Sequence, residues 1–209
     1  MIREFGDSKV RLGDIHDKSE IYSLLNGIKA KIFYSDPPWG DGNIKYWDTM
    51  NKKMNGIFTS TGNFDIDVFL DHVLDYAVNF TDGWVVIEYG NRWVDKVKEK
   101  AKNAGLHYCD SVETLYGSKK KPYTMQVMFF RTDKPLKIDL STIHHTINNQ
   151  TVQAVFDLLF SGHLMEGEYA IDTSCGLGLT AKAALSHNMN FIGNELNATR
   201  IQKTYARFK

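Results

Sequence analysis

The residues with the clearest chemical potential are Asp36-Pro37-Pro38-Trp39, which follow the apolar run 30–34 after Ser35. Each proline fixes φ, removes a backbone N–H and moves the preceding residue out of the helical region. The turn is therefore rigid, and its carbonyls must find donors elsewhere. A carboxylate and a free carbonyl each accept a hydrogen bond from an amino group, while a tryptophan stacks on a flat ring. These four residues predict a site for an aromatic amine.

A second chemically suggestive segment is the glycine-bearing turn after the expected strand 169–172. Gly176 and Gly178 let the backbone approach a ligand closely, and the helix that follows begins with free N–H groups. Glu195 ends the next expected strand, where an acidic side chain can accept hydrogen bonds from ribose hydroxyls. No lysine follows the second glycine, as a phosphate-binding loop requires. The pattern favours a nucleoside cofactor over a nucleoside triphosphate.

Strands and helices alternate along the chain, which predicts an α/β fold with a largely parallel sheet. The expected strands are 9–12, 29–35, 84–89, 169–172 and 190–193, and the expected helices are 17–26, 65–79, 93–104, 151–160, 179–187 and 198–207. Two further strands, 107–116 and 123–131, predict an antiparallel hairpin whose tip, within 115–124, is basic.

Length and composition predict one domain over residues 1–209, because 209 residues suffice for one sizeable core. Basic and acidic residues both number 25, so the net charge does not point to a polyanionic partner, although local patches can still bind one. Cys109 and Cys175 stand in different contexts, and the neighbouring His144 and His145 face different ways, so we expect no disulfide framework and no metal site. We expect no membrane span and no secretory leader, and therefore a cytoplasmic protein.

Three motifs together resemble the permuted β class of S-adenosylmethionine-dependent DNA amino methyltransferases. They are Asp-Pro-Pro-Trp at 36–39, Asp-x-x-x-Gly-x-Gly-x-Thr at 172–180 and Phe-Ile-Gly-x-Glu-Leu at 191–196. In that class, as here, the catalytic turn precedes the cofactor turn in the sequence. The resemblance covers nearly the whole chain, since residues 11–14 look like the strand beside the cofactor adenine. It implies a Rossmann-like methyltransferase fold in circularly permuted order.

The resemblance also implies roles for individual residues. Asp36 and the Pro37 carbonyl would accept the two amine protons, and Trp39 would stack on the base, with Pro38 completing the catalytic turn. For the cofactor S-adenosylmethionine, Glu195 would bind the ribose and Asp14 the adenine amino group. The remaining expected cofactor-binding residues are Asp172, Ser174, Cys175, Gly176, Gly178, Thr180 and Asn197.

The chain departs from the family pattern in three places. Residues 144–150 replace the usual Lys-Pro before the helix that precedes the cofactor strand, so roles in binding the methionine part are open there. The cofactor turn begins Asp172-Thr173-Ser174 rather than Asp-Pro-Phe. No large insertion is available as a target-recognition domain, which favours short or relaxed sequence specificity.

Two basic segments are candidates for nucleic-acid contact. The long polar loop 40–63 and the hairpin tip contribute Lys45, Tyr46, Trp47, Lys52, Lys53, Lys119, Lys120 and Lys121. Lysines of this kind bind phosphates and the aromatic rings stack on bases. The alternatives are that the lysines only solvate a hairpin tip and that the aromatic residues anchor the loop to the core.

The function predicted from these motifs is methyl transfer to the exocyclic amine of adenine in duplex DNA, with the base flipped out. An aspartate before the prolines favours adenine, since serine or threonine there goes more often with cytosine in the family. The alternatives are the same chemistry on RNA or single-stranded nucleic acid, and a non-catalytic nucleic-acid-binding subunit. Because one small protomer offers limited DNA surface, we also expect a homodimer.

Overall fold

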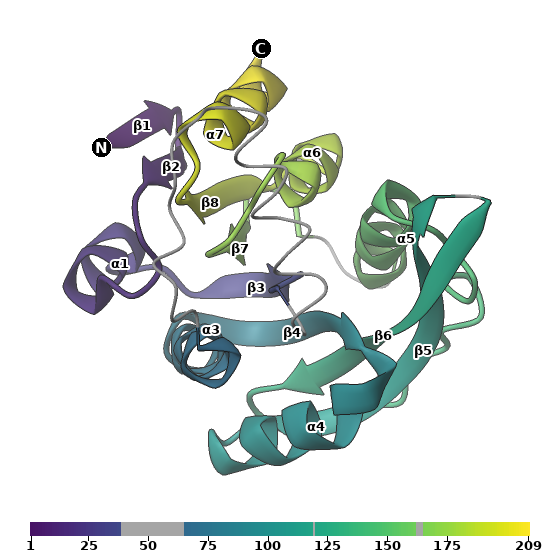
Figure 1. The fold of residues 1–209 in the computed structure, drawn as a ribbon. Helices are drawn as coiled ribbons and strands as arrows, with labels where there is room; N and C mark the ends of the chain where they lie inside the picture. The colour runs from purple at the N-terminus through teal and green to yellow at the C-terminus, as the bar shows by residue number, and fades with distance from the viewer. Residues whose placement is uncertain (39–64, 119, 162–164) are drawn as a thin grey trace.

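The centre of the molecule is an 8-stranded sheet with the strand order β1-β2-β8-β7-β3-β4-β6-β5 (Figure 1). It is seen in a computed structural model that describes residues 1–38, 65–118, 120–161 and 165–209. The strands are β1 Ile2–Phe5, β2 Ser8–Leu12, β3 Ala30–Ser35, β4 Thr81–Gly90, β5 His107–Ser118, β6 Lys121–Arg131, β7 Tyr169–Asp172 and β8 Asn190–Glu195.

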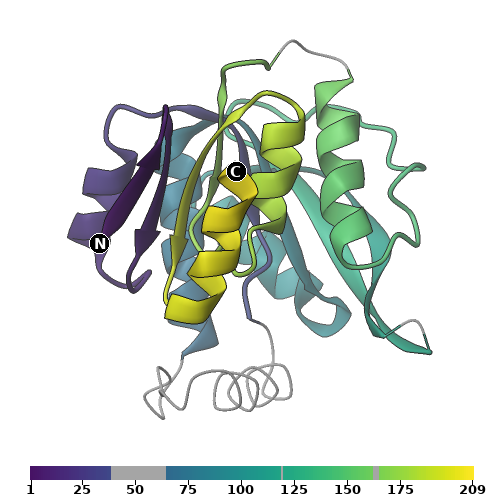
Figure 2. The same cartoon turned by 90° about the horizontal axis from the view of Figure 1, so that it is seen from above.

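The helices are α1 Lys18–Leu25, α3 Ile66–Phe80, α4 Val94–Asn103, α5 Asn149–Phe160, α6 Leu179–Ser186 and α7 Ala198–Tyr205, with the short 3-10 turns η1 Asn91–Trp93 and η2 Ala206–Phe208. Helices lie in front of and behind the sheet in the view turned by 90° (Figure 2). Among the described helices, none is long and apolar enough to cross a bilayer.

Five neighbouring strands, from β2 through β8, β7 and β3 to β4, run parallel to one another. β1 pairs with β2 in the antiparallel sense, and β6 and β5 continue the sheet beyond β4 in the same way. The prediction of an α/β fold with a mostly parallel sheet and an antiparallel hairpin is confirmed. Strand β1 was not expected, because its alternation is short and it lies at an edge, where three of its four residues are exposed.

Two apolar cores lie on opposite faces of the sheet because successive side chains of a strand point to opposite sides. On β3, Phe33 packs into the core shared with α1, α3 and α4. Tyr34 points the other way, where its ring lies 6.2 Å from that of Phe156 on α5. The strands that carry the site are therefore held from both faces.

The chain ends close to where it begins. The rings of Phe5 on β1 and Phe208 in η2 are stacked with centroids 4.3 Å apart, and the two termini lie on the same side of the molecule (Figure 1). This contact closes the apolar core beneath α7 at the β1 edge of the sheet.

The β5–β6 hairpin is tighter than predicted. Both strands continue into the expected tip, so that Gly117 pairs with Pro122 and Ser118 with Lys121. The predicted hairpin, with strands of roughly 107–116 and 123–131, is confirmed, and each strand extends two residues further toward the tip. Gly117 has a φ of 100° within this extension. Lys120 remains exposed at the turn, and Lys119 lies outside the described residues.

Residues 143–148 form a strap along the outer side of β5. Asn148 is its anchor, because its amide donates to the Gly117 carbonyl at 2.8 Å and accepts from the Gly117 N–H at 2.9 Å. Its backbone N–H also donates to the Leu115 carbonyl at 3.1 Å. The strap covers part of an edge strand that would otherwise present unpaired backbone groups.

We predict that Asn148→Ala lowers the free energy of unfolding by about 2 kcal/mol more than Asn188→Ala, since two side-chain hydrogen bonds are lost. Asn188 is a matched control: it also has a positive φ, 55° against 49°, and is exposed. Denaturant unfolding of both variants measures the difference. Equal losses would show that the Asn148 side-chain bonds do not hold the strap.

Candidate functional site

The two predicted turns meet because β3 and β7 are neighbouring parallel strands. Phe33 is paired with Ile171, so the chain leaves both strands at the same edge of the sheet. Asp36 follows the end of β3, and Asp172 ends β7. The charge of Asp172 acts on Asp36 and helps to raise its pKa. Segments more than 130 residues apart in the chain therefore form one site at the carboxyl ends of the strands, where α/β sheets bind ligands.

Asp36 is exposed, Pro37 is buried and Pro38 is half-buried. Loss of hydration and the neighbouring Asp172 raise the pKa of Asp36 to about 7. Because the side chain keeps contact with solvent, water screens part of this effect. Trp39 and the expected loop residues Lys45, Tyr46, Trp47, Lys52 and Lys53 lie outside the described residues.

Glu88 is a third carboxyl group at this edge, and sequence reasoning missed it. Ser35 pairs with Ile87, so Asp36 and Glu88 come next on the neighbouring strands β3 and β4. Glu88 is only 4% exposed and accepts a hydrogen bond from the Tyr34 hydroxyl. Burial and Asp172 raise its pKa to about 8. A glutamate within an otherwise apolar strand was the available signal, since such a residue is seldom buried without a partner.

Asp172 is held by the turn that it begins. Its two carboxylate oxygens accept hydrogen bonds from the Thr180 hydroxyl at 2.6 Å and the Ser174 N–H at 3.0 Å. Burial raises its pKa to about 7, although these two donors oppose the shift. Asp172 thus interacts electrostatically with Asp36 and with Glu195.

Glu195 closes the other side of the glycine turn. Its carboxylate accepts from the Gly176 N–H at 2.8 Å and from the Asn197 N–H at 2.7 Å. Burial raises its pKa, against these bonds and the nearby Arg200. The Leu196 N–H is a further backbone donor to this carboxylate. A carboxylate has about four acceptor positions, so it keeps capacity for a ligand beyond these three bonds.

The two glycines have different reasons to be glycine. Gly176 and Gly178 both have positive φ, 52° and 71°. A Cβ at Gly178 would also lie 2.8 Å from the Thr204 Cα on α7, whereas a Cβ at Gly176 would meet a single atom, at 3.9 Å. Gly178 therefore packs the turn against α7, while the side of Gly176 is open for close approach.

Of three other predicted residues, Cys175 and Asn197 have structural roles and Ser174 does not use its hydroxyl within the described part of the chain. The Cys175 thiol is buried 3.9 Å from the Thr204 hydroxyl, and burial raises its pKa well above the ordinary value, so it is an unreactive core group. The Asn197 side chain caps α7 by accepting from two backbone N–H groups. Ser174 has a buried hydroxyl with no hydrogen-bond partner among the described residues. Of the three, only Ser174 retains an unused polar side-chain atom in the turn.

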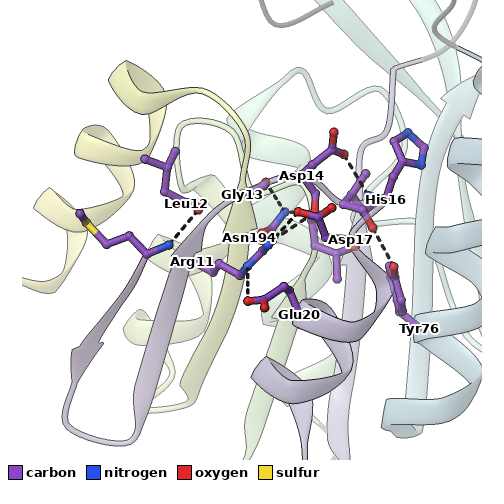
Figure 3. Close-up of polar contacts among 12 residues, drawn as sticks. Arg11, Leu12, Gly13, Asp14, His16, Asp17, Glu20, Tyr76 and Asn194 are labelled. Atoms are coloured by element: carbon purple, nitrogen blue, oxygen red, sulfur yellow. Dashed lines mark hydrogen bonds and ion pairs between the residues drawn. The ribbon is translucent and has the colours of Figure 1, made fainter.

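Asp14 lies in the loop between β2 and α1, at the same edge of the sheet (Figure 3). One of its carboxylate oxygens accepts from the His16 N–H at 2.9 Å, which leaves the second oxygen available. The loop is held to β8, because the Gly13 N–H donates to the Glu195 carbonyl at 3.0 Å. Asp14 and Glu195 are therefore on adjoining segments. This is the arrangement expected if Asp14 binds the adenine and Glu195 the ribose of one nucleoside.

The overall fold was compared with known proteins. The chain matches no known family model, and no curated protein matches its sequence closely enough to show a relationship. The crystal structure of M1.HpyAVI is similar, with a TM-score of 0.64 at 15% identity over 95% of this chain and 97% of that one. This chain has a methyltransferase fold.

Two further structures support the same conclusion. TTHA0409 of Thermus thermophilus, described as a putative DNA modification methylase, gives a TM-score of 0.60 at 15% identity, with 95% and 93% of the chains covered. PvuII DNA methyltransferase, which is cytosine-N4-specific, gives 0.58 at 12% identity, with 97% and 86% covered. M1.HpyAVI and TTHA0409 have also been crystallised with S-adenosylmethionine.

We predict that Gly176→Ala and Gly178→Ala separate binding from stability. In both variants an alanine must adopt a positive φ, which lowers the free energy of unfolding by about 1 kcal/mol. In Gly178→Ala the new Cβ also collides with α7, so the total loss is about 3 kcal/mol. Gly176→Ala should keep most of its stability and lose affinity for S-adenosylmethionine. Thermal unfolding and calorimetric titration measure the two effects. Unchanged cofactor affinity in Gly176→Ala would contradict a close approach at this residue.

We predict that Glu88 makes the protein less stable as the pH rises. Its pKa is raised from 4.5 to about 8 in the fold, so the folded state binds the proton more tightly than the unfolded state. The contribution is fully present below the unfolded pKa and is lost as the pH rises through the folded value. Glu88→Gln should therefore lose less stability than the wild type between about pH 5 and about pH 8.

Denaturant unfolding at the two pH values measures this difference. Glu99→Gln is the control, because Glu99 is exposed on α4 and its replacement should leave the pH dependence unchanged. A pH dependence in Glu88→Gln equal to that of the wild type would contradict the proposed buried protonation.

Proposed function

We propose that this protein transfers a methyl group from S-adenosylmethionine to the exocyclic amino group of adenine in DNA. The observation that carries the proposal is the meeting of the Asp36 turn with the Asp172–Glu195 region at one edge of the sheet. An acceptor for an aromatic amine and a site for a nucleoside lie on adjoining strands. The likeness to DNA methyltransferase structures supports the fold in which these sites would work together.

The residues of the glycine turn and of the two segments beside it fit S-adenosylmethionine. Glu195 offers acceptors for the ribose hydroxyls, and Asp14 offers one for the adenine amino group. Gly176 leaves open space for the backbone to approach the ligand, and the Ser174 hydroxyl has no partner among the described residues. When bound, S-adenosylmethionine supplies an electrophilic methyl group on a sulfonium centre. The buried Asp172 would favour the positive end of such a ligand.

Asp36 and the Pro37 carbonyl would act on the attacking amine. The adenine amine is a poor nucleophile because its lone pair is delocalised into the ring. Hydrogen bonds from both amine protons to these two acceptors would pull the nitrogen toward tetrahedral geometry and localise the lone pair. Much of the rate would come from holding the reacting atoms in line. Asp36 is an acceptor first, because the amine becomes acidic once it is methylated and can then release its proton.

The choice of adenine rests on the aspartate that precedes the prolines, as the resemblance implies. Cytosine N4, the site of PvuII DNA methyltransferase, is the competing base. A target amine in duplex DNA is reached only by flipping the base out of the stack. Lys120, exposed at the hairpin turn, together with Lys119, Lys121 and the loop 40–63, would contact the phosphates. The expected homodimer would enlarge the DNA-binding surface.

We predict that Asp36→Ala lowers methyl transfer by about 100-fold or more, because a positioned acceptor for the reacting group is lost. Binding of S-adenosylmethionine should be retained, since Asp36 lies on the amine side of the site. Transfer of a radiolabelled methyl group and calorimetric titration measure the two quantities. Asp95→Ala, on the exposed side of α4, is the control. Full activity in Asp36→Ala would overturn the assigned role.

The substrate is identified by comparing methyl transfer to duplex DNA, single-stranded DNA and RNA of one sequence, followed by nucleoside analysis of the product. We expect N6-methyladenine in duplex DNA. Formation of N4-methylcytosine would show that cytosine, not adenine, is the target base. Preferred transfer to RNA or single-stranded DNA would show that duplex DNA is not the substrate. Binding of nucleic acid without binding of S-adenosylmethionine would favour the non-catalytic subunit.

A further inference from the structure

Asn194 joins three segments of the site through one buried side chain. Its amide nitrogen donates to the Gly13 carbonyl at 3.1 Å and to the Thr173 carbonyl at 3.2 Å. Its amide oxygen accepts from Arg11 Nη1 at 2.8 Å. The side chain is 1% exposed, so these bonds are made away from competing water. The loop that bears Asp14 and the turn that follows β7 are thus tied to the same residue of β8.

Arg11 supports the same loop from below (Figure 3). Its guanidinium is buried, at 4% exposure, and also donates to the Asp14 carbonyl at 3.1 Å. The loop lies directly on it, because a Cβ on Gly13 would come within 2.3 Å of the guanidinium carbon. Any side chain at position 13 would displace Arg11, and with it the backbone that positions Asp14.

The outer side of the guanidinium is neutralised by two acids. Asp17 lies 3.1 Å and Glu20 3.8 Å from Arg11 nitrogens, with their own side chains 56% and 63% exposed. Because the two acids are exposed, water screens their attraction to Arg11. The specific geometry therefore comes from the inner contacts, which require a planar group with several donors at fixed angles.

Neither the Arg11 nor the Asn194 side chain lies on the face of the sheet to which Glu195 points. Arg11 and Asn194 are paired across β2 and β8. Asn194 shares its face with Ile192, which packs in the core with α1 and α3, whereas Glu195 and Phe191 point to the opposite face. Arg11 and Asn194 therefore act on a ligand through the segments that they hold.

We propose that Arg11 and Asn194 are positioning residues that hold the Asp14 loop at the distance from Glu195 that an adenine nucleoside requires. Through Asp14, they make recognition of the adenine 6-amino group selective. This inference rests on the proposed function, because it takes the cofactor to be S-adenosylmethionine with its adenine amine at Asp14.

The test compares two ligands that differ only at the adenine amine. One is S-adenosylhomocysteine, and the other is its analogue with hydrogen in place of the 6-amino group. The wild type should bind the first more tightly by about tenfold or more, the value of a hydrogen bond to a charged acceptor. Arg11→Lys keeps the positive charge but loses the planar guanidinium with its several donors. The preference for the ligand with the 6-amino group should therefore fall to about threefold or less. Calorimetric titration measures both affinities.

A second variant covers the case in which Arg11→Lys does not fold. Asn194→Asp keeps an acceptor for Arg11 and removes the donors to Gly13 and Thr173, and it should reduce the preference in the same way. Glu20→Gln, which changes only the outer ion pair, should leave the preference unchanged. A merely structural role would weaken both ligands equally and keep their ratio.

The outcomes separate the two claims. If the wild type binds neither ligand, the proposed function fails, and the inference fails with it. If the wild type prefers the amine and both Arg11→Lys and Asn194→Asp retain that preference, the inference alone is overturned. A wild type that binds both ligands equally also overturns it, since Asp14 then does not read the amine. Loss of the preference in either variant, with Glu20→Gln unaffected, supports it.

Discussion

The parallel pairing of β3 with β7 is the constraint on which the site depends. Asp36 and Asp172 belong to segments separated by most of the chain, and only this pairing makes them neighbours. In a parallel pair both strands end at the same edge, so the Asp36 turn and the turn that begins at Asp172 face the same space. The helices on the two faces serve this pairing by burying the strands from both sides.

The site holds four carboxyl groups, of which Glu88, Asp172 and Glu195 are buried and Asp36 is exposed. Asp36, Glu88, Asp172 and Glu195 all have raised pKa values, and loss of hydration is the largest cause for each. Buried carboxyl groups are costly in their charged form, and the fold tolerates them with specific donors: the Tyr34 hydroxyl, the Thr180 hydroxyl and several backbone N–H groups. A positively charged ligand would recover part of this cost, which is the electrostatic reason to expect a sulfonium cofactor rather than a phosphate at this edge.

The two faces of the sheet carry different parts of the site. On the side of α5, α6 and α7 lie the acidic groups that we expect to meet the cofactor. On the side of α1 and α3, Arg11 and Asn194 connect the segments that carry those groups (Figure 3). Since alternate residues of β8 point to opposite faces, Asn194 and Glu195 can have these separate roles while being neighbours in the chain.

The amino-acid sequence alone determined the alternation of strands and helices, the two turns, and the order in which they occur, because hydrophobic periodicity and glycine or proline turns are local signals. It also determined which carboxylates lie at or just after the ends of strands, so Asp36, Asp172 and Glu195 could be named as candidate site residues from the sequence. Local signals say nothing about which strands pair, so the meeting of the turns, the partnership of Tyr34 with Glu88 and the contacts of Asn194 were decided by the tertiary structure. Each of these depends on side chains brought together by sheet register across many residues, which periodicity along the chain does not encode.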